Sequence, residues 1–99
     1  MTQLFKALSD PTRRQVLKML RKGPLTAGEL ADAFPVSRAT MSAHFAVLRE
    51  ADLISAEKDG REIFYRLNLT VLEDGLLGFS EAFGIGARRR TGKSGKVEA

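Results

Sequence analysis

Two helical patterns separated by only the tripeptide Pro35-Val36-Ser37 limit the folds open to this chain. The first lies in "TAGELADAF", where Thr26 and Glu29 have the spacing of a capping box. The second begins after Ser37, which is a favoured N-cap residue, and gives a helix over residues 37–51. Two helices joined by so short a turn must cross steeply. The pair therefore predicts a helix-turn-helix.

The second helix has two unlike faces. Met41, Phe45 and Leu48 fall within a stripe about 60° wide, the signature of a helix that rests on a core. The opposite face carries mostly small side chains, namely alanines and hydroxyl-bearing residues, together with arginines. Such a face is typical either of an ordinary surface helix or of a helix that enters the major groove of DNA. On the second interpretation, the expected contacts to bases and phosphates are Ser37, Arg38, Ala39, Thr40, Ser42, Ala43 and Arg49.

The residues after this helix change from helical to alternating periodicity. In the segment 54–68, apolar side chains alternate on both sides of Asp59-Gly60, a dipeptide typical of a tight hairpin turn. A loop centred on Asp59-Gly60 sets Glu57 opposite Glu62, a repulsive pair that puts this register in doubt. Lys58 and Arg61 flank the tip, so we expect them, and Thr26 at the start of its helix, to contact phosphates.

Helical patterns also lie at the two ends of the segment 1–84. The last, at about residues 70–83, has apolar side chains at i, i+4, i+7 and i+11, and the first contains "LFKAL". So small a domain scarcely has core enough to cover both helices, which favours a homodimer. The expected interface residues are Leu4, Phe5, Leu8, Leu72, Leu76, Phe79 and Phe83.

The positive charge of the chain is concentrated at one end. The 99 residues carry a net charge of +4, yet residues 1–84 hold eleven Lys or Arg and eleven Asp or Glu side chains. We therefore expect a DNA-binding and dimerisation domain over residues 1–84 and a flexible basic tail over residues 85–99. The tail either contacts phosphates without sequence preference or only adds solubility.

Hydropathy and cysteine content exclude several classes of protein. No apolar run approaches the ~18 residues needed to cross a bilayer, and residues 1–10 lack the apolar stretch of a signal peptide, so we expect a cytoplasmic protein. The absence of cysteine excludes disulfides and thiolate metal sites.

Four segments together resemble the arsenical-resistance repressor (ArsR-type) family of bacterial winged-helix regulators: "ALSDPTRRQVLKML", "LTAGELADAF", "VSRATMSAHFAVLREADLI" and "KDGREIFYRLN". The similarity runs from about Leu4 to Phe83. It implies a mainly α winged helix-turn-helix fold with a small β-hairpin, in the order helix-helix-helix-helix-strand-strand-helix. It also implies a homodimer, joined through its first and last helices, that binds a palindromic operator in double-stranded DNA and represses transcription.

The resemblance is to metal-free members of that family. Many members sense metals through a cysteine pair or through His and Asp clusters, whereas this chain has one histidine, His44, for which the resemblance implies a hydrogen bond at the helix edge or a phosphate contact. The sequence thus predicts no metal site and no cofactor. Asp52 stands where relatives often have glycine, a residue that aspartate can replace in the left-handed conformation at modest cost.

Two other functions compete with DNA binding. Catalysis is disfavoured because Ser42 and His44 are two apart on one helix and cannot face each other, and no other nucleophile can be paired with a base. A winged-helix module that binds another protein remains the alternative, and it is disfavoured by Arg38, Lys58 and Arg61 at positions suited to bases and phosphates. The sequence identifies no small-molecule effector.

Overall fold

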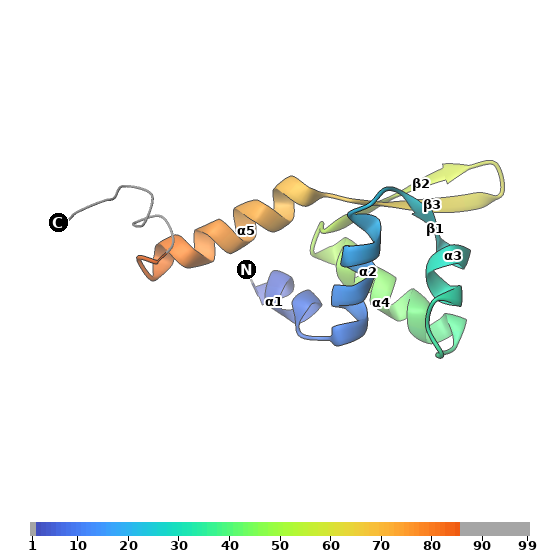
Figure 1. The fold of residues 1–99 in the computed structure, drawn as a ribbon, viewed down its shortest axis with the longest axis horizontal. Coiled ribbons are helices and arrows are strands. Elements are labelled where there is room, and N and C mark those ends of the chain that lie inside the picture. The colour runs from blue at the N-terminus through green and yellow to red at the C-terminus, as the bar shows by residue number, and fades with distance from the viewer. Residues whose placement is uncertain (1, 86–99) are drawn as a thin grey trace.

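A computed structural model gives the fold, and it describes residues 2–85 (Figure 1). The predicted tail, residues 85–99, lies outside the described residues apart from Ile85. The elements are, in chain order, α1 (Thr2–Leu8), α2 (Pro11–Leu20), β1 (Leu25–Thr26), α3 (Ala27–Asp32), α4 (Arg38–Glu50), β2 (Ile54–Asp59), β3 (Glu62–Leu67) and α5 (Leu69–Ala82).

Three of the helices begin at side-chain caps, and two of these caps, at Thr26 and Ser37, are predicted above. The Asp10 carboxylate accepts a hydrogen bond from the backbone N–H of Arg13, with Pro11 at the first helical position of α2. Thr26 and Glu29 form both bonds of the capping box at the start of α3. The Ser37 hydroxyl accepts the N–H of Thr40 at 3.1 Å, which starts α4. The predicted helix-turn-helix is therefore confirmed, with α3 and α4 as its two helices.

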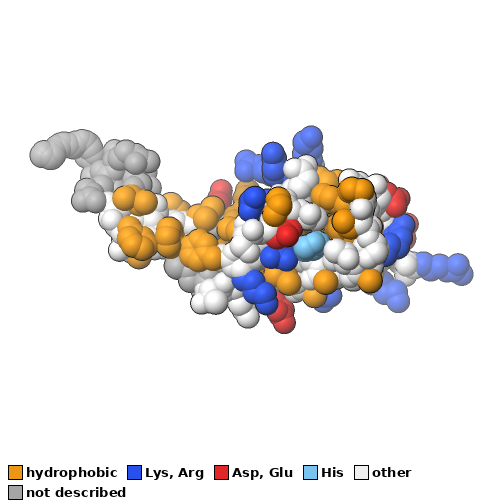
Figure 2. All heavy atoms as spheres, turned by 90° about the horizontal axis from the view of Figure 1, so that it is seen from below, with side chains coloured by type: hydrophobic (Ala, Val, Ile, Leu, Met, Phe, Trp, Pro, Cys, Tyr) orange, Lys and Arg blue, Asp and Glu red, His pale blue; other side chains and the backbone are white. Residues whose placement is uncertain are grey.

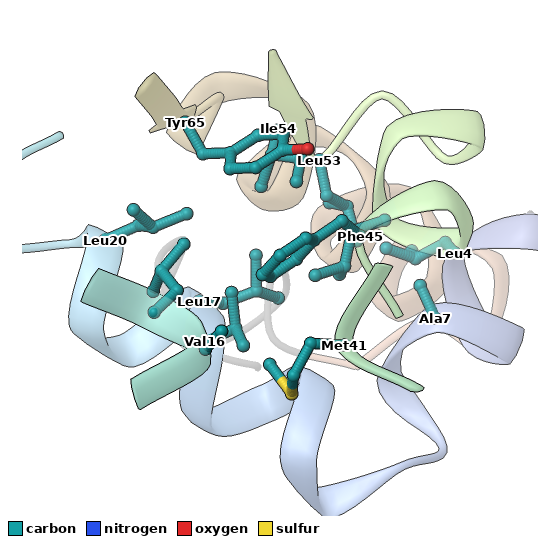
Figure 3. Packing of buried hydrophobic residues seen from close by; sticks show 13 residues of the cluster. Leu4, Ala7, Val16, Leu17, Leu20, Met41, Phe45, Leu53, Ile54 and Tyr65 are labelled. Carbon is teal, nitrogen blue, oxygen red and sulfur yellow. The ribbon is translucent and has the colours of Figure 1, made fainter. Parts of the chain in front are cut away.

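The core lies where α1, α2, α3, α4 and the hairpin meet (Figure 3). The predicted stripe of α4 supplies Met41, Phe45 and Leu48, which are 0%, 4% and 0% exposed. The ring of Phe45 packs on that of Tyr65 from β3, with centroids 4.8 Å apart. The remaining buried apolar residues are Leu4, Ala7, Val16, Leu17, Leu20, Leu30, Ala31, Leu53 and Ile54. Truncating one of the buried leucines to alanine is expected to cost about 2–5 kcal/mol of stability.

The sheet has three strands, whereas the sequence predicted two. β1 pairs antiparallel with β3, with Leu25 opposite Tyr65 and Thr26 opposite Phe64, so the strand order is β1-β3-β2. A strand of two residues has no measurable periodicity, and only its tertiary partner makes it a strand. The extra strand joins the start of α3 to the hairpin.

The hairpin turn also differs from its prediction. Its central residues are Gly60 and Arg61, so Asp59 pairs with Glu62 and Glu57 with Phe64. Gly60 has a φ of +65°, and among the described non-glycine residues only Asp52 has a positive φ. A turn centred on Asp59-Gly60 would need positive φ at both positions, whereas the observed turn needs it only at glycine. The two registers put the same side chains on the same faces, so the alternating pattern could not distinguish them.

The left-handed conformation predicted at the end of α4 is confirmed. Asp52 has a φ of +60°, and the side-chain amide of Asn68 donates a hydrogen bond of 2.9 Å to its carbonyl oxygen. The chain then turns directly into β2 at Ile54. This cap fixes where the hairpin leaves the helix-turn-helix.

The helix α5 extends away from the body at the end opposite the hairpin tip (Figure 1). None of its residues is buried, although half of them are apolar. Figure 2 shows apolar side chains gathered over this end of the molecule. The start of α4 and the tip of the hairpin both lie toward the other end of the molecule.

Candidate nucleic-acid interface

The face of α4 that the sequence assigned to DNA is open to solvent. Arg38, Ala39, Thr40, Ser42 and Ala43 are all exposed, while the opposite stripe of the helix is buried in the core. The small side chains let the helix backbone come close to another surface. This face has the shape and the hydrogen-bonding groups that a recognition helix needs.

Arg38 lies between the two helices of the helix-turn-helix. One of its terminal nitrogens is 3.0 Å from a carboxylate oxygen of Asp32 on α3, and the two side chains are 70% and 74% exposed. Its other terminal nitrogen approaches Gly28, where a β-carbon, if the residue had one, would lie 3.9 Å away. An ion pair this exposed contributes about 0–1 kcal/mol, so the guanidinium can leave Asp32 for a base at little cost.

Ser37 and Thr40 share their hydroxyl groups. The Ser37 hydroxyl accepts the N–H of Thr40 and donates to the Thr40 hydroxyl oxygen at 3.0 Å. The Ser37 hydroxyl is therefore occupied by the cap, whereas Thr40 keeps a hydroxyl hydrogen that it can donate. Of the two predicted contacts, Thr40 is the better placed to bond a base or a phosphate.

Thr26 is the predicted phosphate contact whose side chain is least accessible. It is 9% exposed, and its hydroxyl oxygen accepts the N–H of Glu29 at 3.0 Å. Its own N–H donates to the Glu29 carboxylate at 2.8 Å. The structure thus gives Thr26 a role in the cap and in β1.

His44 turns away from the exposed face of α4 toward α2. Its side chain is 16% exposed, and Nδ1 lies 3.1 Å from a terminal nitrogen of Arg13. Because a guanidinium only donates, Nδ1 is the acceptor of this hydrogen bond. The same guanidinium donates to the carbonyl oxygens of Ala7 at 2.9 Å and Lys6 at 2.8 Å. Of the two roles implied for His44, the structure shows the helix-edge hydrogen bond.

Arg13 is a residue of this site that the sequence did not predict. One guanidinium joins the end of α1 to the middle of α4, so it fixes the position of the helix that carries the exposed face. Its spacing from His44, 31 residues along the chain, gave no local signal. Only the position of the arginine three residues after the Asp10 cap indicates that it lies near that cap.

Asp10 completes this cluster. One of its carboxylate oxygens is 3.9 Å from Nδ1 of His44. Burial acts to raise the pKa of Asp10, but the backbone N–H of Arg13, the positive charge that His44 can carry, the N–H of Thr12 and the charge of Arg13 together hold that pKa below its usual value. The carboxylate is therefore stabilised in its charged form.

The remaining predicted cations are exposed and separate. Lys58 and Arg61 lie at the tip of the hairpin, at the end of the molecule where α4 begins (Figure 1). Arg49 is in the last turn of α4, about 16 Å along the helix from Arg38 at 1.5 Å per residue. Cations spaced this widely suit contacts with phosphates on both sides of a groove.

The residues predicted for a dimer interface divide into two groups. Leu4 is 8% exposed and packs in the core of its own chain, beside Gly75 of α5. The ring of Phe5 meets that of Phe79 edge to face, with centroids 4.8 Å apart. Leu8 and Leu72 are half-buried, whereas Phe79, Leu76 and Phe83 are 36%, 45% and 65% exposed.

Neither a membrane-spanning helix nor a metal-binding cluster occurs within residues 2–85. No helix in this part of the chain is long and apolar enough to cross a bilayer. No cluster there brings together three or more of the His, Cys, Asp and Glu side chains that could hold a metal ion.

Several known proteins are similar to this chain in sequence, and several solved structures have a similar fold. A helix-turn-helix domain model matches residues 8–55. The transcriptional repressor SdpR of Bacillus subtilis (strain 168) is 45% identical over 76 residues, which cover 77% of this chain and 84% of SdpR. An arsenical resistance operon repressor of Staphylococcus aureus is 35% identical over 74 residues, which cover 75% of this chain and 71% of that protein.

Solved structures agree with these relatives. An ArsR-like transcriptional regulator from Rhodococcus sp. RHA1 matches with a TM-score of 0.76 at 33% identity, covering 83% of this chain and 75% of that one. A possible transcriptional regulator for arsenical resistance matches with a TM-score of 0.69 at 38% identity, covering 81% and 85% of the two chains. The chain belongs to the ArsR family of winged-helix DNA-binding transcriptional regulators, which are not enzymes.

Proposed function

We propose that this protein is a dimeric repressor that binds a palindromic operator with α4 in the major groove. The observation that carries the proposal is the exposed face of α4, which is lined by small and hydrogen-bonding side chains while its other face is fixed in the core. In a helix-turn-helix the second helix enters the groove with its N-terminal residues against base edges. Arg38, Thr40 and Ser42 are then the readers of sequence, and Ala39 and Ala43 contact thymine methyl groups.

Phosphate contacts would fix the position of α4 in the groove. Arg49 contacts phosphate from the far end of the helix, and Lys58 and Arg61 do so from the hairpin, which acts as the wing. Arg13 acts indirectly, because it holds α4 against α1 through His44. Thr26 and Ser37 support the site as caps.

The dimer is proposed on the exposure of α5. A fourteen-residue helix with no buried residue leaves Leu76, Phe79 and Phe83 in water, which a second copy of the helix would cover. Phe5 belongs to the same surface because its ring packs on Phe79. A twofold axis through this surface would present two copies of α4, and half-sites about 34–36 Å apart would then form a palindrome.

Repression is proposed from the names of two relatives. SdpR of Bacillus subtilis and the Staphylococcus aureus protein are both called repressors. HlyU of Vibrio cholerae, 36% identical over 67 residues, is called an activator, so the names of the relatives do not all give the same direction of regulation. The proposed unit is the domain 1–84, acting in the cytoplasm on double-stranded DNA, with residues 85–99 adding phosphate contacts without sequence preference.

Selection of duplexes from a random pool by the purified full-length protein tests the proposal. The expected result is an enriched sequence with twofold symmetry, bound by two protomers. The control is a variant with Arg38, Thr40 and Ser42 all changed to alanine, which keeps the buried face of α4 and should fold but enrich nothing. Failure of the unaltered protein to enrich any duplex would contradict DNA recognition and favour a module that binds protein.

A further inference from the structure

A hollow between α2, α5 and the end of β3 is not used by the proposed DNA contacts. Its volume is about 260 Å³, close to the lower end of the range of small-ligand pockets. Its apolar lining consists of leucines only: Leu8, Leu17, Leu67, Leu69, Leu72 and Leu76. It can therefore hold a short, unbranched apolar body.

Three cationic side chains line one side of this hollow. Arg14, Lys18 and Arg21 line it from one face of α2, at positions i, i+4 and i+7. Arg14 donates a hydrogen bond of 2.7 Å to the carbonyl oxygen of Leu8, so one of its nitrogens is already occupied. Neither Lys18 nor Arg21 has an ion pair or side-chain hydrogen bond with any residue in the part of the chain that the structure describes. No acidic side chain lines the hollow.

A second hollow has a lining of mixed charge. It is larger, about 460 Å³, and lies against β2 and β3. Its lining includes Glu57 and Asp59 as well as Lys58 and Arg66, so the opposite charges leave no preference for the sign of a ligand. Among these two hollows, only the one beside α2 combines a leucine floor with charges of a single sign.

We propose that the hollow beside α2 binds a small amphipathic anion, namely an aliphatic carboxylate with a short unbranched chain. The chain would lie on the leucines of α5 and β3, which removes apolar surface from water. The carboxylate would lie between Lys18 and Arg21, whose flexible stems reach over the rim and whose charges have no competing partner. This binding does not require DNA. Leu8, Leu72 and Leu76 also belong to the surface predicted for the dimer, so the ligand and a second copy of the chain would compete for these side chains.

Titration of the full-length protein with four probes tests the proposal. Octanoate has the chain and the negative charge, 1-octanol has the chain alone, octylammonium has the chain and a positive charge, and acetate has the negative charge alone. Octanoate should bind most tightly, octanol more weakly, octylammonium more weakly still, and acetate not measurably. Backbone amide shifts in an NMR titration with octanoate should be largest around Leu17, Leu67 and Leu72.

Two double variants then separate local charge from net charge. Replacing both Lys18 and Arg21 with alanine should raise the Kd for octanoate about two- to thirtyfold, the range expected for the loss of two exposed ion pairs, and leave the Kd for octanol unchanged. Replacing Lys22 and Arg66 with alanine removes the same charge at residues that do not line the hollow, and it should leave both constants unchanged. Both variants alter exposed residues, and circular dichroism verifies that they fold.

Three results would overturn the proposal. The first is equal affinity for octanoate and octylammonium, which would mean that the cations are not used. The second is an equal effect of the two double variants. The third is the absence of octanoate binding, which is expected if a second copy of the chain already fills the hollow. Each can occur while the protein still binds its operator, so the proposed function is judged separately.

Discussion

Nδ1 of His44, on the recognition helix α4, accepts a hydrogen bond of 3.1 Å from Arg13 on α2. The same guanidinium holds the carbonyl oxygens of Ala7 and Lys6 at the end of α1. The side chain of Arg13 thus connects α4, which is proposed to read DNA, with α1, which belongs to the proposed dimer surface. A shift of α1 that breaks these bonds would remove one of the contacts that position α4, while its buried stripe would still pack in the core.

Replacing Arg13 with alanine should therefore lower both stability and DNA affinity. Three hydrogen bonds are lost and partly buried acceptors are left without their donor, so we expect a loss of about 1–3 kcal/mol in the free energy of unfolding, measured with urea. Arg13→Lys keeps the charge but cannot form the fork of bonds, and it should recover only part of the loss. Gln15→Ala, an exposed change on the same helix, is the control. Equal stability of the Arg13 and Gln15 variants would contradict this account.

The carboxylate of Asp10 should make the free energy of unfolding depend on pH in the acid range. Its pKa is lowered in the folded state, so its charged form stabilises the fold above the unfolded pKa of about 3.9, and the contribution disappears as the pH falls through the lower folded pKa. Asp10→Asn keeps a good cap without the charge. The gap in unfolding free energy between the two proteins should be constant near neutral pH and shrink below about pH 4. A gap independent of pH would mean that the charge of Asp10 plays no part.

Asp32→Asn should strengthen operator binding. The substitution releases Arg38 from its ion pair and removes a negative charge beside the site, and an exposed pair of this kind corresponds to up to about fivefold in Kd. Fluorescence anisotropy with a labelled operator measures the change. Glu73→Gln removes an equal charge from α5, at the other end of the molecule, and should have little effect. Weaker binding by the Asp32 variant would show that Asp32 holds Arg38 in its reading position.

Leu76→Glu and Phe83→Glu should each weaken or abolish the dimer without unfolding the chain. These side chains are 45% and 65% exposed, so the substitutions cost the protomer little, whereas a charge buried in an interface without a partner costs several kcal/mol. Sedimentation velocity measures the state of assembly. Ile63→Glu on the hairpin, where the isoleucine is 43% exposed, is the matched control. Dimers that persist in both α5 variants would move the interface elsewhere.

Deleting residues 85–99 should weaken binding to all duplexes alike. The segment carries five Lys or Arg side chains and one Glu, and loosely placed charges neutralise phosphates without reading bases. The slope of log K against log salt should flatten by at most about 0.9 for each phosphate that the shortened protein no longer neutralises. A loss of discrimination between operator and scrambled duplex would instead show that the segment reads sequence.

The parts of the fold that depend on neighbouring residues could be predicted. The caps at Thr26 and Ser37 and the core stripe of α4 follow from spacing within one helix, because a capping bond spans three residues and a helical stripe repeats every turn. The left-handed conformation of Asp52 was expected from the family resemblance, because relatives often have glycine at this position.

The parts of the fold that depend on residues distant in the sequence could not be predicted. β1 exists only because Leu25 and Thr26 pair with β3, about forty residues later in the chain. The hairpin register was ambiguous because a shift of two residues keeps every side chain on its face. The site had the same limit: the exposed face of α4 was predicted, but the contacts of Arg13 and of Asp32 required the helices to be placed in space.

The most direct test of the account compares Arg38→Ala with Arg49→Ala on the selected operator and on a scrambled duplex at the same salt concentration. If α4 reads sequence at its start and contacts phosphate at its end, Arg38→Ala should cost about 1–3 kcal/mol on the operator and much less on the scrambled duplex, with preference relaxed at one position in each half-site. Arg49→Ala should weaken both duplexes equally. If Arg38→Ala also weakens both duplexes equally, Arg38 does not read the sequence and the central claim is wrong.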